Sequence, residues 1–307
     1  MDKKNIKKPT VTVAISAYNE EKNICKFLKS VLMQKEQGFV LKQIWIYSDG
    51  STDKTAEVAR SIKSEKIKVI KHEERIGKSA RLNEIYKNLK TDILVQSDSD
   101  IVFAHPNVVK DLIEPLKNKG IAMCGGNPLP VKAKTFIEKA INVTVGAYLE
   151  FRKKVRGGNN VFSADGRLLA FKKRLVKKIH VPPNMIANDM YVYYSCLSLG
   201  YKYKYVDSAV VKFRSPQTLR DHIKQNTRFR ASPIRMKKYF PERLVDRENN
   251  IPAFIFFSEI LKQFIKHPVL SLYIYTVNKY CNIKAKIVEK KLTAKWPMAN
   301  TTKKLTG

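Results

Sequence analysis

Four short apolar segments, each separated from the next by a helical pattern, lie in the first hundred residues. The segments are rich in β-branched residues, which is typical of buried strands. They occupy residues 11–17, 44–47, 67–70 and 93–96. Between them, apolar residues recur at the three- and four-residue spacing of amphipathic helices. This alternation predicts a parallel sheet with helices on both faces.

Polar side chains follow three of these four predicted strands. Tyr18 and Glu20 come after the first strand, Asp49 ends the second, and Asp98 and Asp100 come after the fourth. The carboxyl ends of parallel strands meet at one edge of a sheet, and ligands of open α/β sheets bind beyond that edge. The sequence therefore predicts a binding site there.

The pair Asp98 and Asp100 has the chemistry of a site for a divalent cation. In an extended segment alternate side chains lie on the same side, so we expect both carboxylates to face one ion. Mg²⁺ and Mn²⁺ prefer oxygen ligands and commonly take one or two carboxylates together with substrate phosphates. We therefore expect Mg²⁺ or Mn²⁺ here, neutralising a departing diphosphate.

The charge balance indicates an anionic partner. The chain has 59 Lys and Arg against 27 Asp and Glu, a formal net charge of +32 over 307 residues. Such a chain is attracted to nucleic acid, anionic lipid or phosphorylated small molecules, and composition does not choose among them. The four cysteines lack the spacing of a zinc site and indicate a reducing compartment.

The C-terminal part differs in character from the rest of the chain. A predicted helix at 251–265 has one apolar stripe, and a second apolar run follows at 269–277. Neither run is long enough to span a membrane, and residues 1–10 are basic and polar, so we expect no signal peptide. Basic amphipathic helices suit an anionic membrane surface. The alternative is a helical pair that packs on the rest of the protein.

Seven segments agree in order and spacing with a known family. They are residues 13–21, 47–55, 75–83, 98–100, 162–173, 187–190 and 225–229. Together they resemble the inverting glycosyltransferases of family two, over roughly residues 10–240. The resemblance implies the GT-A fold, a Rossmann-like α/β architecture with a mostly parallel sheet flanked by helices. It implies a catalytic domain at 1–240 and a C-terminal helical segment at 241–307 that associates with a membrane.

The resemblance also implies roles for residues on the donor side. The catalytic domain divides into a nucleotide-sugar half at about 10–100 and an acceptor half at about 101–240. Tyr18 and Glu20 would contact the base and the ribose of the donor, and Asp49 would hydrogen-bond the base. Lys78 would lie near the donor phosphates. Asp98 would bind the donor and, with Asp100, the metal ion.

On the acceptor side the resemblance implies three catalytic residues. Asp189 would be the general base, and Gln225 and Arg228 would line the site, with Arg228 stabilising the diphosphate as charge develops on it. The chain departs from the usual family pattern at Asn188, where an acid is common, and at Phe229, where Trp is common.

The predicted function is transfer of a hexose from a nucleotide-diphosphate sugar to a lipid-linked or glycan acceptor at the cytoplasmic face of a membrane. A polyprenyl-phosphate glycosyltransferase and a processive polysaccharide synthase both remain open. The alternatives from other classes are a basic protein that binds nucleic acid or another polyanion, and a catalytically inactive scaffold. Conservation of charge at Asp98, Asp100, Asp189 and Arg228 relative to the family pattern disfavours the scaffold.

Overall fold

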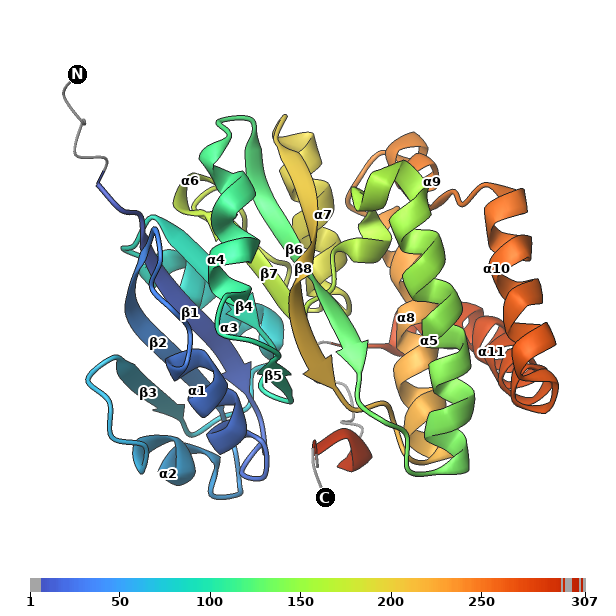
Figure 1. The fold of residues 1–307 in the computed structure, drawn as a ribbon, viewed down its shortest axis with the longest axis horizontal. Coiled ribbons are helices and arrows are strands. Elements are labelled where there is room, and N and C mark those ends of the chain that lie inside the picture. The colour runs from blue at the N-terminus through green and yellow to red at the C-terminus, as the bar shows by residue number, and fades with distance from the viewer. Residues whose placement is uncertain (1–6, 294, 296–299, 304, 306–307) are drawn as a thin grey trace.

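One mixed sheet of eight strands forms the centre of the molecule (Figure 1). The computed structural model describes residues 7–293, 295, 300–303 and 305. The prediction of no signal peptide concerns residues 1–10, and residues 1–6 of that segment lie outside the described residues. The strand order is β3-β2-β1-β4-β7-β6-β8-β5. The strands are β1 (Thr10–Ala17), β2 (Val40–Asp49), β3 (Ile67–His72), β4 (Ile93–Ser97), β5 (Ile101–Phe103), β6 (Ile121–Pro130), β7 (Leu168–Lys172) and β8 (Lys202–Phe213).

The four strands predicted from the apolar segments are confirmed as β1 to β4. They pair in parallel, with β1 between β2 and β4, and β3 beyond β2. Within the family-like segment at 162–173, residues Leu168–Lys172 form β7. This strand is antiparallel to β4 and to β6. The parallel pair β6 and β8 and the antiparallel strand β5 complete the sheet.

Helices cover both faces of the sheet, as predicted. Buried side chains of α1 (Ile24–Leu32) and α4 (Val108–Ile113) pack on one face together with part of α2 (Thr55–Arg60). Those of α3 (Lys78–Asn88), α6 (Lys173–Val176) and α7 (Asn188–Ser198) pack on the other. Short 3₁₀ helices lie at η1 (Glu114–Lys117), η2 (Val155–Gly158), η3 (Val161–Ser163), η4 (Glu289–Lys291) and η5 (Asn300–Lys303).

A second group of helices lies beside the sheet (Figure 1). It consists of α5 (Phe136–Lys154), α8 (Leu219–Met236), α9 (Glu242–Asn249), α10 (Ala253–Lys266) and α11 (Pro268–Val288). Helix α5 begins at a capping box, in which Thr135 and Glu138 each satisfy a backbone N–H of the other. Helix α10 packs on α5, and α11 packs on both α5 and α8.

The predicted helix at 251–265 is confirmed as α10, and the apolar run at 269–277 is the first half of α11. No helix in the described part of the chain combines the length and the apolarity needed to cross a membrane. After α11 the chain returns to the sheet, where Leu305 donates its N–H to Asn23 Oδ1 at 3.1 Å and accepts from Arg214. The domain boundary at residue 240 stays a prediction.

Gly50 lies at a turn where a side chain does not fit. Its φ is +64°, and a Cβ there would lie 2.4 Å from the backbone nitrogen of Arg75. We expect Gly50→Ala to lower the free energy of unfolding by about 3 kcal/mol, from backbone strain and a clash with the neighbouring loop. Urea denaturation measures this loss.

Gly38→Ala is the matched control for Gly50→Ala. Gly38 also has a positive φ, +82°, but no atom lies within 4 Å of the position of its Cβ. The control carries the backbone strain alone, about 1 kcal/mol. Equal losses in the two variants would show that the contact with the loop at Arg75 has no energetic role.

Candidate active site

The loops that follow β1 and β2 are joined by hydrogen bonds. Asn19 adopts a positive φ of 54°, and its side-chain oxygen accepts from the backbone N–H of Thr52 at 2.8 Å. The backbone N–H of Glu20 donates to Thr55 Oγ1 at 2.7 Å. Tyr18, which comes just before, lies with its ring 4.0 Å from the guanidinium of Arg75. The two predicted nucleotide-binding loops therefore form one surface.

Asp49 holds the start of α3 in place. Its carboxylate accepts from the backbone N–H groups of Ile76 and Gly77, both at 2.9 Å, and from Arg81 Nε at 2.8 Å. Asp49 and Glu20 are both buried, and Glu20 accepts from the side-chain amide of Asn23. Because Gly77 directly precedes Lys78, these bonds fix the position of the first turn of α3, which begins at Lys78.

Asp98 and Asp100 lie in the bend between β4 and β5. The expectation that they lie in an extended segment is wrong, because β4 ends at Ser97. Asp98 forms an ion pair with Lys78. Burial, together with the negative charge of Asp98, raises the pKa of Asp100, whereas Arg167 and Lys78 act in the opposite direction. The charge of Asp98 therefore acts directly on Asp100.

Arg167 is a central cation of the site that the sequence reasoning missed. Its guanidinium pairs with Asp165 at 2.9 Å and lies 3.9 Å from the centre of the Phe213 ring. Burial opposes its charge, but Asp165, Asp100 and Asp98 together raise the pKa of Arg167. Only the pairing of β7 with β4, which has no local signal in the sequence, brings Arg167 to the acids.

Asp189, the predicted general base, is the second residue of α7. Its carboxylate accepts from the backbone N–H of Gly166 at 3.1 Å and from that of Met190 at 2.9 Å. Burial and the nearby charge of Asp165 raise the pKa of Asp189, while Lys78 and the two backbone bonds lower it. A carboxylate with a raised pKa binds a proton more tightly, which suits a general base.

Asn188 has a structural role at the same helix start. Its side-chain oxygen accepts from Ser79 Oγ at 2.8 Å, and both residues are buried. This bond joins the first turn of α7 to the first turn of α3. Two helix N-termini, each with a positive partial charge, therefore lie side by side at the site.

Arg228 reaches the site from α8. It donates to the carbonyl of Ile186 at 3.3 Å, and its guanidinium lies 5.1 Å from the centre of the Phe229 ring. Burial lowers the pKa of Arg228 to about 10, while the charges of Asp189 and Asp98 oppose that shift. Gln225 lies one turn earlier on α8 and is half-buried.

The structure thus brings together the predicted residues of β4, α3, α7 and α8. Four acids and three cations interact electrostatically with one another at this site. They are Asp98, Asp100, Asp165, Asp189, Lys78, Arg167 and Arg228. Among the described residues, no group of three or more His, Cys, Asp or Glu side chains could hold a metal ion. Two carboxylates fit Mg²⁺ or Mn²⁺ when the ligand supplies further oxygen atoms.

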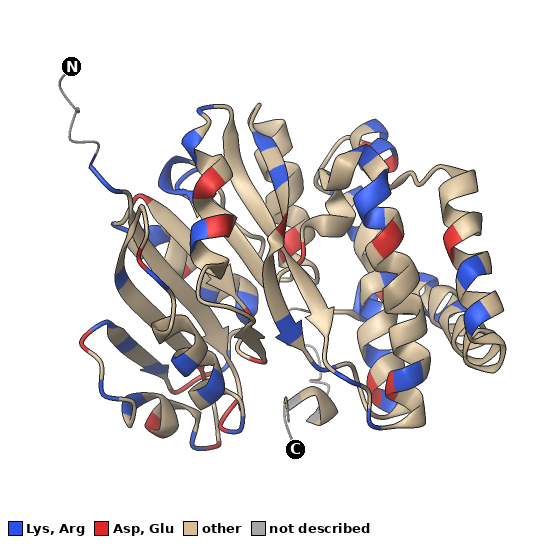
Figure 2. Ribbon diagram, viewed as in Figure 1, with Lys and Arg blue, Asp and Glu red and all other residues tan. Residues whose placement is uncertain are grey.

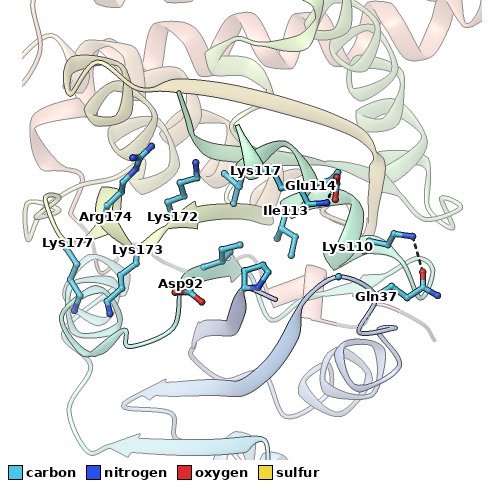
Figure 3. Close-up of a pocket in the computed structure, with 14 residues that line it drawn as sticks. Gln37, Asp92, Lys110, Ile113, Glu114, Lys117, Lys172, Lys173, Arg174 and Lys177 are labelled. Carbon is cyan, nitrogen blue, oxygen red and sulfur yellow. Dashed lines mark hydrogen bonds and ion pairs between the residues drawn. The ribbon is translucent and has the colours of Figure 1, made fainter. Parts of the chain in front are cut away.

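A different cavity lies at the opposite edge of the sheet (Figure 3). Its volume is about 620 Å³, and it is lined at the amino end of β4 by Asp92 and Ile93 and at the carboxyl end of β7 by Lys172. Ile93 and Lys172 are paired in the sheet, whereas Ser97 and Leu168 are paired at the site. In Figure 3 the side chain of Lys172 points away from that of Lys173. None of the predicted site residues lines this cavity.

Comparison with known proteins matches the chain to a family of glycosyltransferases. The model of the family described as "Glycosyl transferase family 2" matches residues 12–180. Poly-beta-1,6-N-acetyl-D-glucosamine synthases are 27% identical over 225 residues in Staphylococcus aureus and 25% identical over 224 residues in Staphylococcus epidermidis. Each alignment covers 71% of this chain and 53% of the relative, so the chain spans about half the length of these curated relatives.

Solved structures share the fold. A mannosyltransferase from Pyrobaculum calidifontis, in complex with GDP-Man and Mn²⁺, matches 91% of this chain and 73% of its own with a TM-score of 0.58 and 17% identity. Glucosyl-3-phosphoglycerate synthase from Mycobacterium tuberculosis, in complex with Mn²⁺ and UDP-glucose, matches 74% of this chain and 78% of its own, with a TM-score of 0.53 and 20% identity. The expected GT-A architecture is confirmed.

Replacing Arg167 removes a buried cation from a cluster of acids. In Arg167→Gln we expect the folded-state pKa of Asp100 to rise further, because the positive charge that acts to lower it is lost. A carboxyl group whose pKa is raised on folding loses its stabilising contribution as pH increases through that pKa. The stability loss should therefore grow as pH rises above about 4, where an unperturbed Asp ionises, and reach about 3 kcal/mol by about pH 8.

Urea denaturation across this pH range measures the effect, with Arg60→Gln on the exposed surface of α2 as the control. The control removes the same charge without a buried acid and should change stability little at any pH. A loss in Arg167→Gln that is independent of pH would contradict the electrostatic role of Arg167.

Proposed function

The chain belongs to glycosyl transferase family 2 and is a glycosyltransferase, and we propose that it transfers a sugar from a nucleotide-diphosphate sugar with inversion at the anomeric carbon. The observation that carries the proposal is the position of Asp189. A carboxylate with a raised pKa lies among Lys78, Arg228 and the acid pair that begins at Asp98. A base beside an anion-binding site is what a single displacement from a nucleotide sugar requires.

The donor diphosphate would lie at the N-termini of α3 and α7. Lys78 begins α3, and Asn188 joins the two helix starts through Ser79. Backbone N–H groups and the helix dipoles favour phosphate at this position. Tyr18, Glu20 and Asp49 belong to the adjoining loops and define the side on which we place the nucleoside.

Asp189 would take the proton of the acceptor hydroxyl as its oxygen attacks the anomeric carbon. The new bond from carbon to oxygen forms as the bond to the diphosphate oxygen breaks, and that oxygen keeps the electron pair. Attack on the face opposite to the leaving group inverts the configuration. Arg228 and Lys78 stabilise the charge that develops on the diphosphate, with Gln225 lining the same side of the site.

Asp98 and Asp100 would hold Mg²⁺ or Mn²⁺ together with donor phosphate oxygens. When bound, the ion supplies further neutralisation of the diphosphate charge. Burial and the negative charge of Asp98 raise the pKa of Asp100. The repulsion between the two acids supports this assignment, because a cation that they shared would relieve it. The Mn²⁺ in the mannosyltransferase complex from Pyrobaculum calidifontis supports it as well.

For the acceptor we propose a lipid-linked sugar or a growing glycan at the cytoplasmic face of a membrane. The similarity to poly-beta-1,6-N-acetyl-D-glucosamine synthases supports a glycan, and the net charge of +32 supports an anionic surface nearby. We assign the reaction to residues 1–240, because every residue with a proposed role lies there. Residues 241–307 would position this unit at the membrane.

Donor turnover with Asp189→Asn tests the function. The wild-type protein is incubated with a panel of nucleotide sugars, Mn²⁺ or Mg²⁺ and membrane extract as the acceptor source, and nucleoside diphosphate release is measured. We expect release that EDTA abolishes and that falls about 10³-fold in the variant, because a general base contributes roughly 10²- to 10⁴-fold.

Glu114→Gln is the control, since Glu114 is an exposed acid at the opposite edge of the sheet. It removes the same charge and should retain wild-type turnover. Wild-type turnover in Asp189→Asn would reject Asp189 as the base. No turnover and no metal-dependent nucleotide binding with any donor would reject the proposed function itself.

A further inference from the structure

Helix α11 has two faces of opposite character along its whole length. The face that packs against α5 and α8 is buried, and its buried residues are Ser271, Ile274, Asn278, Cys281 and Ala285. On the opposite side an apolar stripe faces outward within an arc of about 80°, taking about 100° for each residue. The stripe consists of Val269, Leu272, Tyr280, Ile283 and Ile287.

Helix α10 repeats this arrangement. Its buried residues Ile255 and Glu259 face α5, while a second apolar stripe faces outward. That stripe consists of Phe254, Phe257, Leu261 and Ile265. The nine outward side chains of the two stripes are each between 51% and 76% exposed. Ile265 and Val269 lie four residues apart on either side of the turn at Pro268, so the stripes meet at the corner.

The charges beside the stripes are all positive. Between residues 253 and 288 the chain has five lysines and a single acid, Glu259. Glu259 is buried and is paired with Lys154 and Lys262, so it compensates only one of these five lysines. On α11, Lys279 and Lys286 border one side of the stripe and Lys284 borders the other. The blue segments of both helices in Figure 2 are lysines, because neither helix contains an arginine.

We propose that the outer face of α10 and α11 is a membrane-docking surface whose partner is a bilayer containing anionic lipid. An apolar stripe bordered by lysines fits the boundary between acyl chains and negatively charged head groups. A second copy of the chain is a poor partner, since each copy carries a net charge of +32 and presents the same lysines. An exposed apolar surface of this extent needs a partner.

The docking surface is connected to the candidate active site through α8. Asn278 on the inner face of α11 bonds to His222 at 3.0 Å and to the side-chain amide of Asn226 at 2.6 Å. Arg228 lies on the same helix, half a turn beyond Asn226. Docking would therefore hold the site at a fixed orientation to the bilayer. This last step alone rests on the proposed function.

Co-sedimentation of the full chain with vesicles tests the docking surface. The vesicles are phosphatidylcholine alone, or phosphatidylcholine with about 30% phosphatidylglycerol, at roughly 0.15 M salt. We expect binding to the anionic vesicles that falls at least about tenfold in Leu261→Ser/Ile265→Ser and in Leu272→Ser/Ile283→Ser. Lys279→Gln and Lys286→Gln should each weaken it about fivefold, with no such effect on neutral vesicles.

Met33→Ser/Leu199→Ser is the matched control, because both residues are exposed and apolar but lie outside α10 and α11. It should bind like the wild type. Equal binding of the stripe variants and the wild type would overturn the proposal. So would a wild-type dimer in sedimentation velocity that the stripe variants lose, or capture of an acidic protein without vesicle binding.

Hydrolysis of the donor in the absence of vesicles separates this proposal from the proposed function. None of the substituted residues belongs to the candidate site, so hydrolysis should be unchanged in every stripe variant. Vesicle binding by a protein that turns over no donor would leave the docking surface in place and reject only the transferase reaction.

Discussion

The antiparallel pairing of β4 with β7 is the constraint on which the candidate site depends. β4 is the last strand of the parallel half, and β7 enters the sheet beside it from the other half. At the carboxyl end of β4, Ser97 pairs with Leu168, and Ser97 Oγ donates to the carbonyl of Arg167 at 2.8 Å. The chain therefore leaves β4 at Asp98 and enters β7 from Arg167 at the same point. Acids from one half and a cation from the other meet because two strands pair in one register.

The cations of the candidate site do not fully compensate the charge of its buried acids. Burial and mutual repulsion raise the pKa of Asp100 and of Asp189, although Lys78 acts against both shifts. Burial of acids beside one another lowers the free energy of unfolding of the protein without its ligands, and functional sites commonly lower stability in this way. A cation between Asp98 and Asp100 and an anion near Arg228 would each relieve part of it. The same imbalance gives Asp189 its basicity.

Much of the parallel half was predictable because its signals are local. Each strand of β1 to β4 is an apolar run, and Asp49 and Asp98 come at the ends of such runs at the expected edge. Only the family resemblance indicated Lys78. The antiparallel insertion of β7 was not predictable, because strand pairing over a long sequence separation leaves no periodic pattern. Arg167 was missed for that reason, since only the pairing brings it to the acids. The bond between Asn188 and Ser79 joins residues 109 positions apart and has no local signal either.

The sequence left two alternatives for the C-terminal segment, a packed helical pair and a membrane-binding surface. The structure and our proposal assign them to opposite faces of the same helices. The inner faces of α10 and α11 pack on α5 and α8, and their outer faces carry large exposed apolar side chains. Binding of nucleic acid accounts for the lysines and for the exposed aromatic residues Phe254, Phe257 and Tyr280. It does not account for the six aliphatic side chains of the stripes, which offer bases no stacking surface. An anionic bilayer accounts for both. Because α8 carries Arg228 into the site and Asn226 toward α11, the same helix connects the proposed chemistry with the proposed membrane surface.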